Sequence, residues 1–131
     1  MRSKIKMSSF SKSWKSSKKP KKQRKYIANA PLHIRSKLLS AHLSDELSKK
    51  HGKRSSRVKK GDRVKIMTGQ FSQKTGKVER INTKKMRVYI EGVEIQKKDG
   101  TKVKYPISAS NVMIVELDTS DKKRQEIFKR K

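Results

Sequence analysis

The sequence predicts a mostly β protein, a small barrel that carries a basic extended N-terminal arm, two short N-terminal helices and a short C-terminal helix. Residues 60–118 contain several short stretches in which apolar and polar side chains alternate between turn residues, as in small β-barrels. The first acidic residue is Asp45, so residues 1–44 hold 13 Lys and Arg without one carboxylate. We expect four regions: the arm over residues 1–28, short helices and a basic connector over 29–57, the barrel over 58–118, and a basic helix or tail over 119–131.

The charge of the whole chain indicates a polyanionic partner. Its 131 residues include 38 Lys and Arg but 11 Asp and Glu, a formal net charge of +27. Nucleic acid is the expected partner, because each phosphate that a protein neutralises releases a counterion. An anionic membrane surface would also attract the arm, but the arm lacks the amphipathic apolar face that membrane-surface helices use.

The composition excludes several classes of protein. Without cysteine the chain forms no disulfide and no thiolate metal site. The longest apolar run, residues 112–115, is far shorter than the roughly 20 residues of a membrane span, and no apolar signal-peptide core follows the start, so we expect a cytosolic or nuclear protein. His33, His42 and His51 have no close carboxylate, and no P-loop or nucleophile elbow occurs. We therefore expect no metal, no cofactor and no enzyme activity.

The arm is expected to be extended and to become ordered on nucleic acid. Its like charges repel each other, and residues 1–25 contain few groups that could be buried. Phe10 and Trp14 interrupt the basic residues. Exposed aromatic rings stack on unpaired bases, but they also pack on a protein's own surface, and the sequence leaves both alternatives open.

Two of the expected helices have weak end signals. The first begins near Pro31, which a helix tolerates in its first turn, and it places Ile34, Leu38 and Ala41 on one face. The C-terminal helix runs towards Phe128. Its cap is expected at Asp118, Thr119 or Ser120.

The helix between them has better end signals. Ser44 can accept hydrogen bonds from the unpaired N–H groups of the first turn. Acidic residues follow at 45–46 and basic residues at 49–51, so that both ends complement the helix dipole. Gly52 can adopt the left-handed conformation that ends a helix.

Alternation marks the barrel strands at Val64 and Ile66, at Met86, Val88 and Ile90, at Val93 and Ile95, and at Val103 and Tyr105. The run Val112–Val115 is continuously apolar, as expected for a strand that is buried on both faces.

The turn at Asp99-Gly100 predicts the register of one hairpin. A two-residue turn would place Ile95 opposite Lys104 and would mix core with surface. A three-residue loop that begins one residue earlier pairs Ile95 with Val103, keeps one face apolar and requires the glycine to be left-handed in a bulge. A four-residue loop that pairs Ile95 with Tyr105 also preserves the faces; we predict the three-residue loop.

Residues 60–78 carry the most informative pattern of the barrel. Gly69 and Gly76 bracket a polar loop that contains Phe71 and Lys74. The loop offers N–H groups, a cation and an aromatic ring, which suit phosphate and base contacts. The alternative is an ordinary glycine-bounded hairpin with Phe71 tucked inwards, and the spacing alone does not decide between them.

This segment resembles the KOW motif of ribosomal and transcription-factor proteins at Gly61, Val64, Ile66, Gly69, Gly76 and Val78. It departs from the motif at Gln73, where many KOW loops carry a second glycine. Its flanks are similar to the archaeal and eukaryotic form of the large-subunit ribosomal protein L-twenty-four family, called L-twenty-six in eukaryotes. The similarity runs from about Lys21 to Asp121 and includes residues 25–35, 43–47, 52–55, 88–93 and 110–112. Departures fall at residues 55–58, where the family often has a proline before the valine, and at Ser108-Ala109, where His-Pro is common.

The resemblance implies a cytoplasmic protein with a Src-homology-three-like barrel in the large ribosomal subunit. It would bind ribosomal RNA (rRNA) near the mouth of the peptide exit tunnel and act early in subunit assembly. The implied partners are rRNA, neighbouring large-subunit proteins and nascent-chain factors at the tunnel exit, without a homo-oligomer. The hairpin over residues 97–102 would then face solvent and proteins. The alternative is a KOW-type transcription elongation or chromatin-associated nucleic-acid-binding protein. An elongation module would need a companion domain, and it would not explain residues 25–35.

We expect the RNA contacts to come from basic clusters and from the loop. The arm supplies Lys21, Lys22, Arg24 and Lys25, and the family signature adds Asn29, His33 and Arg35. The connector supplies Lys53, Arg54, Arg57, Lys59 and Lys60, among which arginine suits bidentate phosphate contacts. The loop supplies Gln70, Phe71, Lys74 and Lys77.

Overall fold

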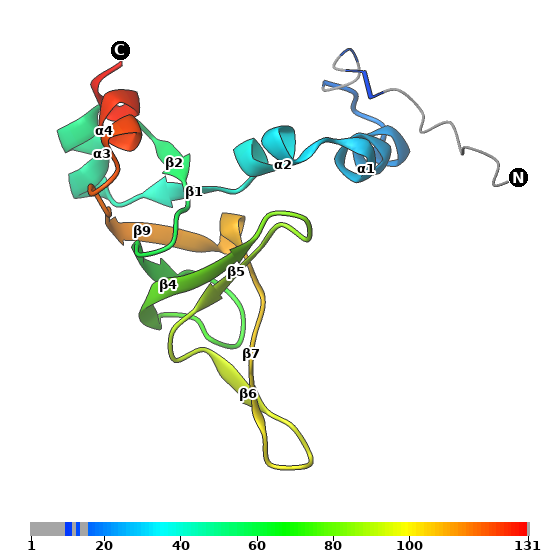
Figure 1. The fold of residues 1–131 in the computed structure, drawn as a ribbon, viewed down its shortest axis with the longest axis vertical. Helices are drawn as coiled ribbons and strands as arrows, with labels where there is room; N and C mark the ends of the chain where they lie inside the picture. Colours follow the sequence, from blue (N-terminus) through cyan, green and yellow to red (C-terminus); the bar gives the residue numbers. More distant parts are fainter. Residues whose placement is uncertain (1–9, 12, 14–15, 131) are drawn as a thin grey trace, which may run out of the picture.

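The computed structural model describes residues 10–11, 13 and 16–130, so that Trp14 and the first nine residues lie outside the described part. The helices are α1 (Pro20–Asn29), α2 (Leu32–Leu38), α3 (Asp45–His51) and α4 (Lys122–Lys129). The strands are β1 (Ser40–Leu43), β2 (Ser55–Arg57), β3 (Arg63–Ile66), β4 (Thr75–Asn82), β5 (Arg87–Ile90), β6 (Glu94–Gln96), β7 (Lys102–Lys104), β8 (Ile107–Ser108) and β9 (Val112–Glu116), with a 3-10 turn over Ala109–Asn111. The expectation of a mostly β, barrel-like fold with a short C-terminal helix is confirmed (Figure 1).

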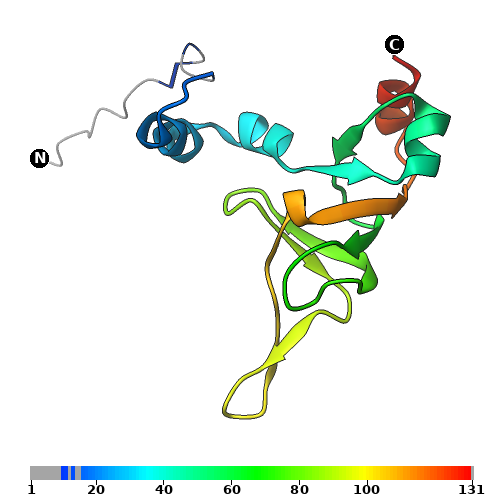
Figure 2. The ribbon, with the colours of Figure 1, turned by 180° about the vertical axis from the view of Figure 1, so that it is seen from behind.

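Seven strands form one curved sheet in the order β2-β1-β9-β3-β4-β5-β8. The pair β1 and β9 is parallel, and the other neighbouring pairs are antiparallel. Strands β6 and β7 form a separate ribbon that projects from the barrel (Figure 1). Figures 1 and 2 both show α1 and α2 leaving the sheet on one side, whereas α3 and α4 lie together on the other.

The core is built by alternate residues of the barrel strands, as the sequence pattern predicts. Its most buried side chains, each at most 1% exposed, are Val64, Ile66, Val78, Val88, Ile90, Val93, Val112 and Ile114. The expectation that β9 is buried on both faces is only partly right. Val112 and Ile114 face the core, but Met113 and Val115 on the other face are half-buried.

The helix predicted from Pro31 through Ala41 is too long. Helix α2 ends at Leu38, and the chain then becomes strand β1. Leu39, Ala41 and Leu43 alternate into the core with a period of two. Tertiary pairing decides this stretch, because β1 hydrogen-bonds to β2 on one edge and to β9 on the other.

The N-terminal arm is not extended throughout, and three helices instead of two precede the barrel. Residues Pro20–Asn29 form α1, which begins with the proline at a first-turn position. Lys, Gln, Arg and Ala are good helix formers, and this local preference outweighs the expected repulsion between like charges. No residue of α1 is buried.

The end signals of α3 are confirmed. The Ser44 side chain accepts a hydrogen bond from the Leu47 N–H, and Gly52 has a left-handed φ of 64°. The cap of α4 differs from the prediction. The Asp121 carboxylate caps this helix by accepting from the N–H of Lys123, so the helix starts later than Asp118, Thr119 or Ser120 would allow.

The hairpin register is confirmed. Ile95 pairs with Val103 across β6 and β7. The Gly100 N–H donates to the Lys97 carbonyl at 3.0 Å, and Gly100 has a φ of 90°, as a three-residue loop with a bulge requires. The paired face is nevertheless not part of the core, since Ile95 and Val103 are 36% and 38% exposed.

A buried ion pair joins α4 to the turn that precedes β3. The two terminal guanidinium nitrogens of Arg124 in α4 donate to the two Asp62 carboxylate oxygens, and the Nη2–Oδ2 distance is 2.6 Å. Both side chains are almost fully buried. Arg124 also donates to the carbonyls of Arg57 and Asp118. Asp62 in turn accepts from the backbone N–H groups of Lys59 and Asp118 at 3.0 Å each. This network connects α4 to the end of β2, to the turn before β3 and to the end of β9.

Candidate nucleic-acid interface

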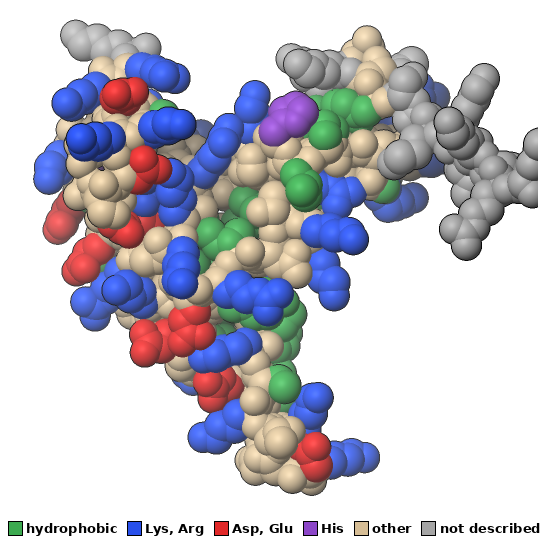
Figure 3. All heavy atoms as spheres, viewed as in Figure 1, with side chains coloured by type: hydrophobic (Ala, Val, Ile, Leu, Met, Phe, Trp, Pro, Cys, Tyr) green, Lys and Arg blue, Asp and Glu red, His purple; other side chains and the backbone are tan. Residues whose placement is uncertain are grey.

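Acidic side chains gather on one part of the surface, whereas basic side chains occur all over it (Figure 3). On the face in Figure 3, Asp and Glu gather on the side of α3, α4 and β4 and at the hairpin tip. The segment of α1 and α2 carries no acidic residue, because none precedes Asp45. This side of the molecule therefore presents uncompensated positive charge.

Helix α1 presents the basic residues predicted in the arm. Lys21, Arg24 and Lys25 are exposed, and Lys22 is half-buried. Lys21 and Lys25 lie one turn apart and so share a face of the helix. Phe10 packs on Tyr26 of this helix with ring centroids 5.0 Å apart, which favours the packing alternative for Phe10.

The three residues of the family signature have different positions. Asn29 and His33 are exposed. Arg35 is committed to the protein: its guanidinium donates to the carbonyl of Ala28 at 2.5 Å and to that of Lys84 at 2.7 Å. It therefore holds the end of α1 against the turn between β4 and β5.

The five basic residues of the connector divide into two groups. Lys53 donates to the Ile127 carbonyl and lies over the Phe128 ring at 5.8 Å, and Lys59 contacts the Asp121 carboxylate at 2.6 Å. These two lysines hold α4. The other group is free in the described part of the chain and exposed: Arg54, Arg57 and Lys60.

Phe71 of the loop is buried, so the tucked-inwards alternative is confirmed for this ring. The centroid of the Phe71 ring lies 5.2 Å from the centroid of the Tyr105 ring. The exposed Lys74 places its Nζ 5.0 Å from the Phe71 centroid. Gln70, Lys74 and Lys77 are exposed. Gln73 adopts a φ of 70°, so the chain keeps a left-handed residue where many KOW loops have glycine.

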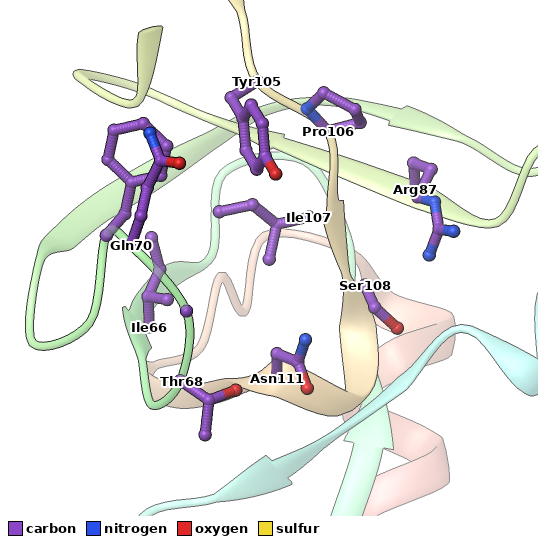
Figure 4. Close-up of a pocket in the computed structure, with 11 residues that line it drawn as sticks. Ile66, Thr68, Gln70, Arg87, Tyr105, Pro106, Ile107, Ser108 and Asn111 are labelled. Atoms are coloured by element: carbon purple, nitrogen blue, oxygen red, sulfur yellow. The ribbon is translucent and has the colours of Figure 1, made fainter. Parts of the chain in front are cut away.

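Within the described part of the chain, hollows on the surface bring candidate residues together. Lys60 and Lys77 line one hollow, but Glu79 and Asp118 line it too, which disfavours an anion there. Arg54 lines a second with His42 and three serines, Ser40, Ser55 and Ser110. The third lies between the loop and the segment that leads into β8, and it contains Gln70 but not Lys74 (Figure 4).

Sequence reasoning missed Arg87, Tyr105 and Asn111, which line this third hollow. Arg87 and Tyr105 were visible only as members of alternating strands. Their common position depends on the pairing of β5 with β8, in which Arg87 lies opposite Ser108. Asn111 belongs to the family-like segment 110–112, but no local signal in the sequence places it in a common site with Arg87 and Tyr105.

Among the described carboxylates, Asp121, Glu79 and Glu94 contact lysines. Lys104 contacts Glu79 at 2.9 Å and Glu94 at 3.0 Å. These hydrogen bonds raise the pKa of Lys104 and lower the pKa of Glu94. The hydrogen bond from Lys59 lowers the pKa of Asp121, and the N–H of Ser120 lowers the pKa of Asp118. All four groups therefore stay charged at neutral pH.

Among the described residues, no three His, Cys, Asp or Glu side chains converge as metal ligands would. In the same part of the chain, no helix is long and apolar enough to span a membrane.

A comparison with protein families identifies the family of this chain. The family model that describes the ribosomal proteins L26 of eukaryotes and L24 of archaea matches residues 17–131. The match covers all four helices and all strands of the structure.

Proposed function

Because the chain belongs to the family of the ribosomal proteins L26 of eukaryotes and L24 of archaea, which are structural components of the large ribosomal subunit, we propose that it binds rRNA through its barrel and its basic N-terminal segment. The observation that carries the proposal is the segregated charge. The segment from α1 to α2 has exposed lysines, the exposed Arg24 and no carboxylate, and β2 and the following turn add Arg57 and Lys60.

The barrel is suited to dock as a preformed unit. Its core is closed, and the Asp62–Arg124 network fixes the ends of β2 and β9 against α4. Arg54 and Arg57 lie on or next to β2, at the edge of the sheet, where both guanidinium groups are exposed to a partner. Bidentate contacts to phosphate are the interaction that such arginines favour.

The N-terminal segment is suited to reach RNA beyond the barrel. Helix α1 has no buried residue, so the barrel contributes little to its stability apart from the Arg35 contacts. A helix of about this length is only marginally stable alone in water. Phosphates along its exposed basic faces would stabilise it by binding the folded form.

We further propose that the protein lies near the mouth of the peptide exit tunnel and takes part in early assembly of the subunit, as its family resemblance implies. The projecting β6–β7 hairpin would then face solvent, neighbouring proteins or nascent-chain factors (Figure 1). Its exposed Ile95 and Val103 offer an apolar contact there.

Sedimentation of the tagged chain from a cell lysate tests the proposal. We expect co-migration with the large subunit at low salt and at high salt, because an integral component is also held by contacts to the folded RNA and to neighbouring proteins that salt does not screen, whereas purely phosphate-based attachment weakens as salt rises. Release into the light fractions, with chromatin or RNA polymerase in the pull-down, would support the transcription or chromatin alternative instead. In a binding experiment in solution, we expect the purified chain to prefer a structured rRNA fragment to duplex DNA.

A further inference from the structure

The cleft of Figure 4 is not explained by electrostatic attachment to phosphates. It has a volume of about 360 Å³. The KOW loop forms one side and the segment from Tyr105 to Asn111 forms the other, with Ile66 and Ile107 as apolar residues between them (Figure 4). This volume suits a single small ring system and its sugar, but not a nucleic-acid helix.

The loop that forms one side of the cleft has backbone N–H groups without a partner in the described chain. Within the described residues, the backbone N–H groups of residues 68–71 donate to no acceptor, whereas those of Met67, Ser72, Gln73 and Lys74 all do. All four residues of the range 68–71 line the cleft. Free backbone donors in a row are suited to ligand oxygen and ring-nitrogen acceptors.

Two side-chain amides and a cation add to these donors. Gln70 and Asn111 line the cleft from opposite sides, and neither side chain has a partner in the described chain. The Arg87 side chain, which also has no partner among the described residues, lines the cleft next to Ser108. None of the residues that line the cleft is acidic, so that negative charge is favoured at its rim.

Tyr105 supplies an aromatic wall that is held in place. Its backbone N–H donates to the Val93 carbonyl at 3.1 Å, and its ring packs on the buried Phe71. The Tyr105 ring is only half-buried, so part of it stays accessible from the cleft. A rigid, accessible aromatic ring is the usual platform for an unpaired base.

We propose that this cleft binds one unstacked nucleotide of RNA. Its base lies against Tyr105 and Ile107, the amides of Gln70 and Asn111 and the loop N–H groups contact its polar edge, and Arg87 contacts a flanking phosphate. The inference rests on the proposed function, because it makes rRNA the source of that nucleotide. It gives the KOW loop a specific role beyond attraction to phosphate.

The direct test is a titration of the full 131-residue chain, followed by amide chemical shifts. The probes are AMP, GMP, CMP and UMP, with ribose 5-phosphate as the probe without a base. We expect saturable shifts in residues 66–71 and 105–111 with at least one nucleotide, and weaker ones with ribose 5-phosphate. Absence of such shifts with all four nucleotides, or equal shifts with ribose 5-phosphate, would overturn the proposal.

Two variants sharpen the test. Tyr105→Leu removes the stacking face but keeps an apolar contact for Phe71, and it is expected to weaken nucleotide binding at least about fivefold. Asn111→Ala, which changes an exposed side chain, should also weaken binding even if the tyrosine variant folds poorly. Tyr89→Leu is the matched control, since Tyr89 contacts Arg80 and does not line the cleft. Unchanged affinity in both cleft variants would contradict the proposal.

Binding to a structured rRNA fragment separates failure of this inference from failure of the proposed function. If the unmodified chain binds the fragment and Tyr105→Leu and Asn111→Ala bind it equally well, the nucleotide site is wrong and the proposed function stands. If the unmodified chain does not bind the fragment, the proposed function is wrong, and the nucleotide titration still decides whether the cleft takes a base.

Discussion

At the scale of single residues, Asp62 and Arg124 show how one charged pair can connect the whole barrel. Asp62 accepts two backbone N–H groups besides the guanidinium, so its charge is well compensated although its side chain is fully buried. A buried carboxylate that loses its countercharge is costly, whereas an exposed ion pair contributes little. The stability of the fold should therefore depend on this pair and not on the number of surface ion pairs.

Arg124→Ala is expected to lower the free energy of unfolding by about 3–5 kcal/mol, because Asp62 would stay buried without its countercharge. Arg63→Ala is the matched control. Arg63 lies 3.6 Å from Glu116 in an exposed pair, and its loss should cost about 1 kcal/mol or less. Urea denaturation followed by circular dichroism measures both values. Equal losses in the two variants would show that burial does not govern the contribution.

The carboxylates with lowered pKa values make stability depend on pH at the acid end. The hydrogen bond from Lys59 holds the pKa of Asp121 below its ordinary value of 3.8. The charged form is thus favoured in the folded state, so its stabilisation is complete above about pH 3.8 and disappears as the pH falls through the lower folded value. Asp121→Asn keeps a helix-capping side chain but removes the charge.

We therefore expect Asp121→Asn to have a lower urea midpoint than the unmodified chain near pH 7 and a similar midpoint near pH 2.5. Midpoints measured across this range check the prediction. A difference between the two proteins that stays constant at all pH values would contradict it, because a purely structural effect of the substitution does not titrate.

At the scale of elements, the same alternating pattern has two outcomes. Val88 and Ile90 on β5 face the core, whereas Ile95 and Val103 on the projecting ribbon remain partly exposed. Alternation predicts which residues share a face of a strand, but it does not predict what covers that face. Val93, the residue before β6, is almost fully buried at the point where the hairpin leaves the barrel.

Val93→Ala should lower the free energy of unfolding by about 2 kcal/mol, since it removes buried methyl groups and leaves a cavity. Val103→Ala, the same change ten residues away, should cost less than about 1 kcal/mol. Denaturation midpoints under identical conditions compare the two variants. A larger loss for Val103→Ala would mean that the ribbon packs on the barrel in solution.

At the scale of the whole molecule, the barrel and the basic segment have separate roles in binding. The barrel has a closed core and supplies shape, while residues 1–25 carry 11 Lys and Arg and no acid. The strands β1 and β2 and the helix α4 belong to the same folded unit as the barrel, because β1 pairs with β9 and Arg124 reaches Asp62. The N-terminal segment is therefore the appendage that carries the uncompensated positive charge.

Deletion of residues 1–25 should reduce the salt dependence of rRNA-fragment binding without unfolding the barrel. Each lost phosphate contact lowers the slope of log affinity against log salt by about 0.7 to 0.9. Affinity measured at several salt concentrations gives the slope for the full and the shortened chain. An unchanged slope would mean that the segment contacts little phosphate.

Features that depend on neighbouring residues could be predicted from the amino-acid sequence. The alternation of the barrel strands, the Ser44 and Gly52 ends of α3 and the register of the 93–105 hairpin were all predicted, because propensity, capping and turn geometry act over a few residues. The clusters of positive charge were equally visible, although Arg35, Lys53 and Lys59 prove to hold the protein's own elements.

Features that depend on distant residues became visible in the folded structure and not before. Strand β1 exists because residues 42 and 43 pair with 113 and 114, and this pairing overrides a helical pattern. The buried pair joins residues 62 positions apart, and the cleft collects side chains from the loop, from β5 and from the 105–111 segment. Pairing, burial and convergence of this kind arise from long-range contacts, and the local sequence at either end does not encode them.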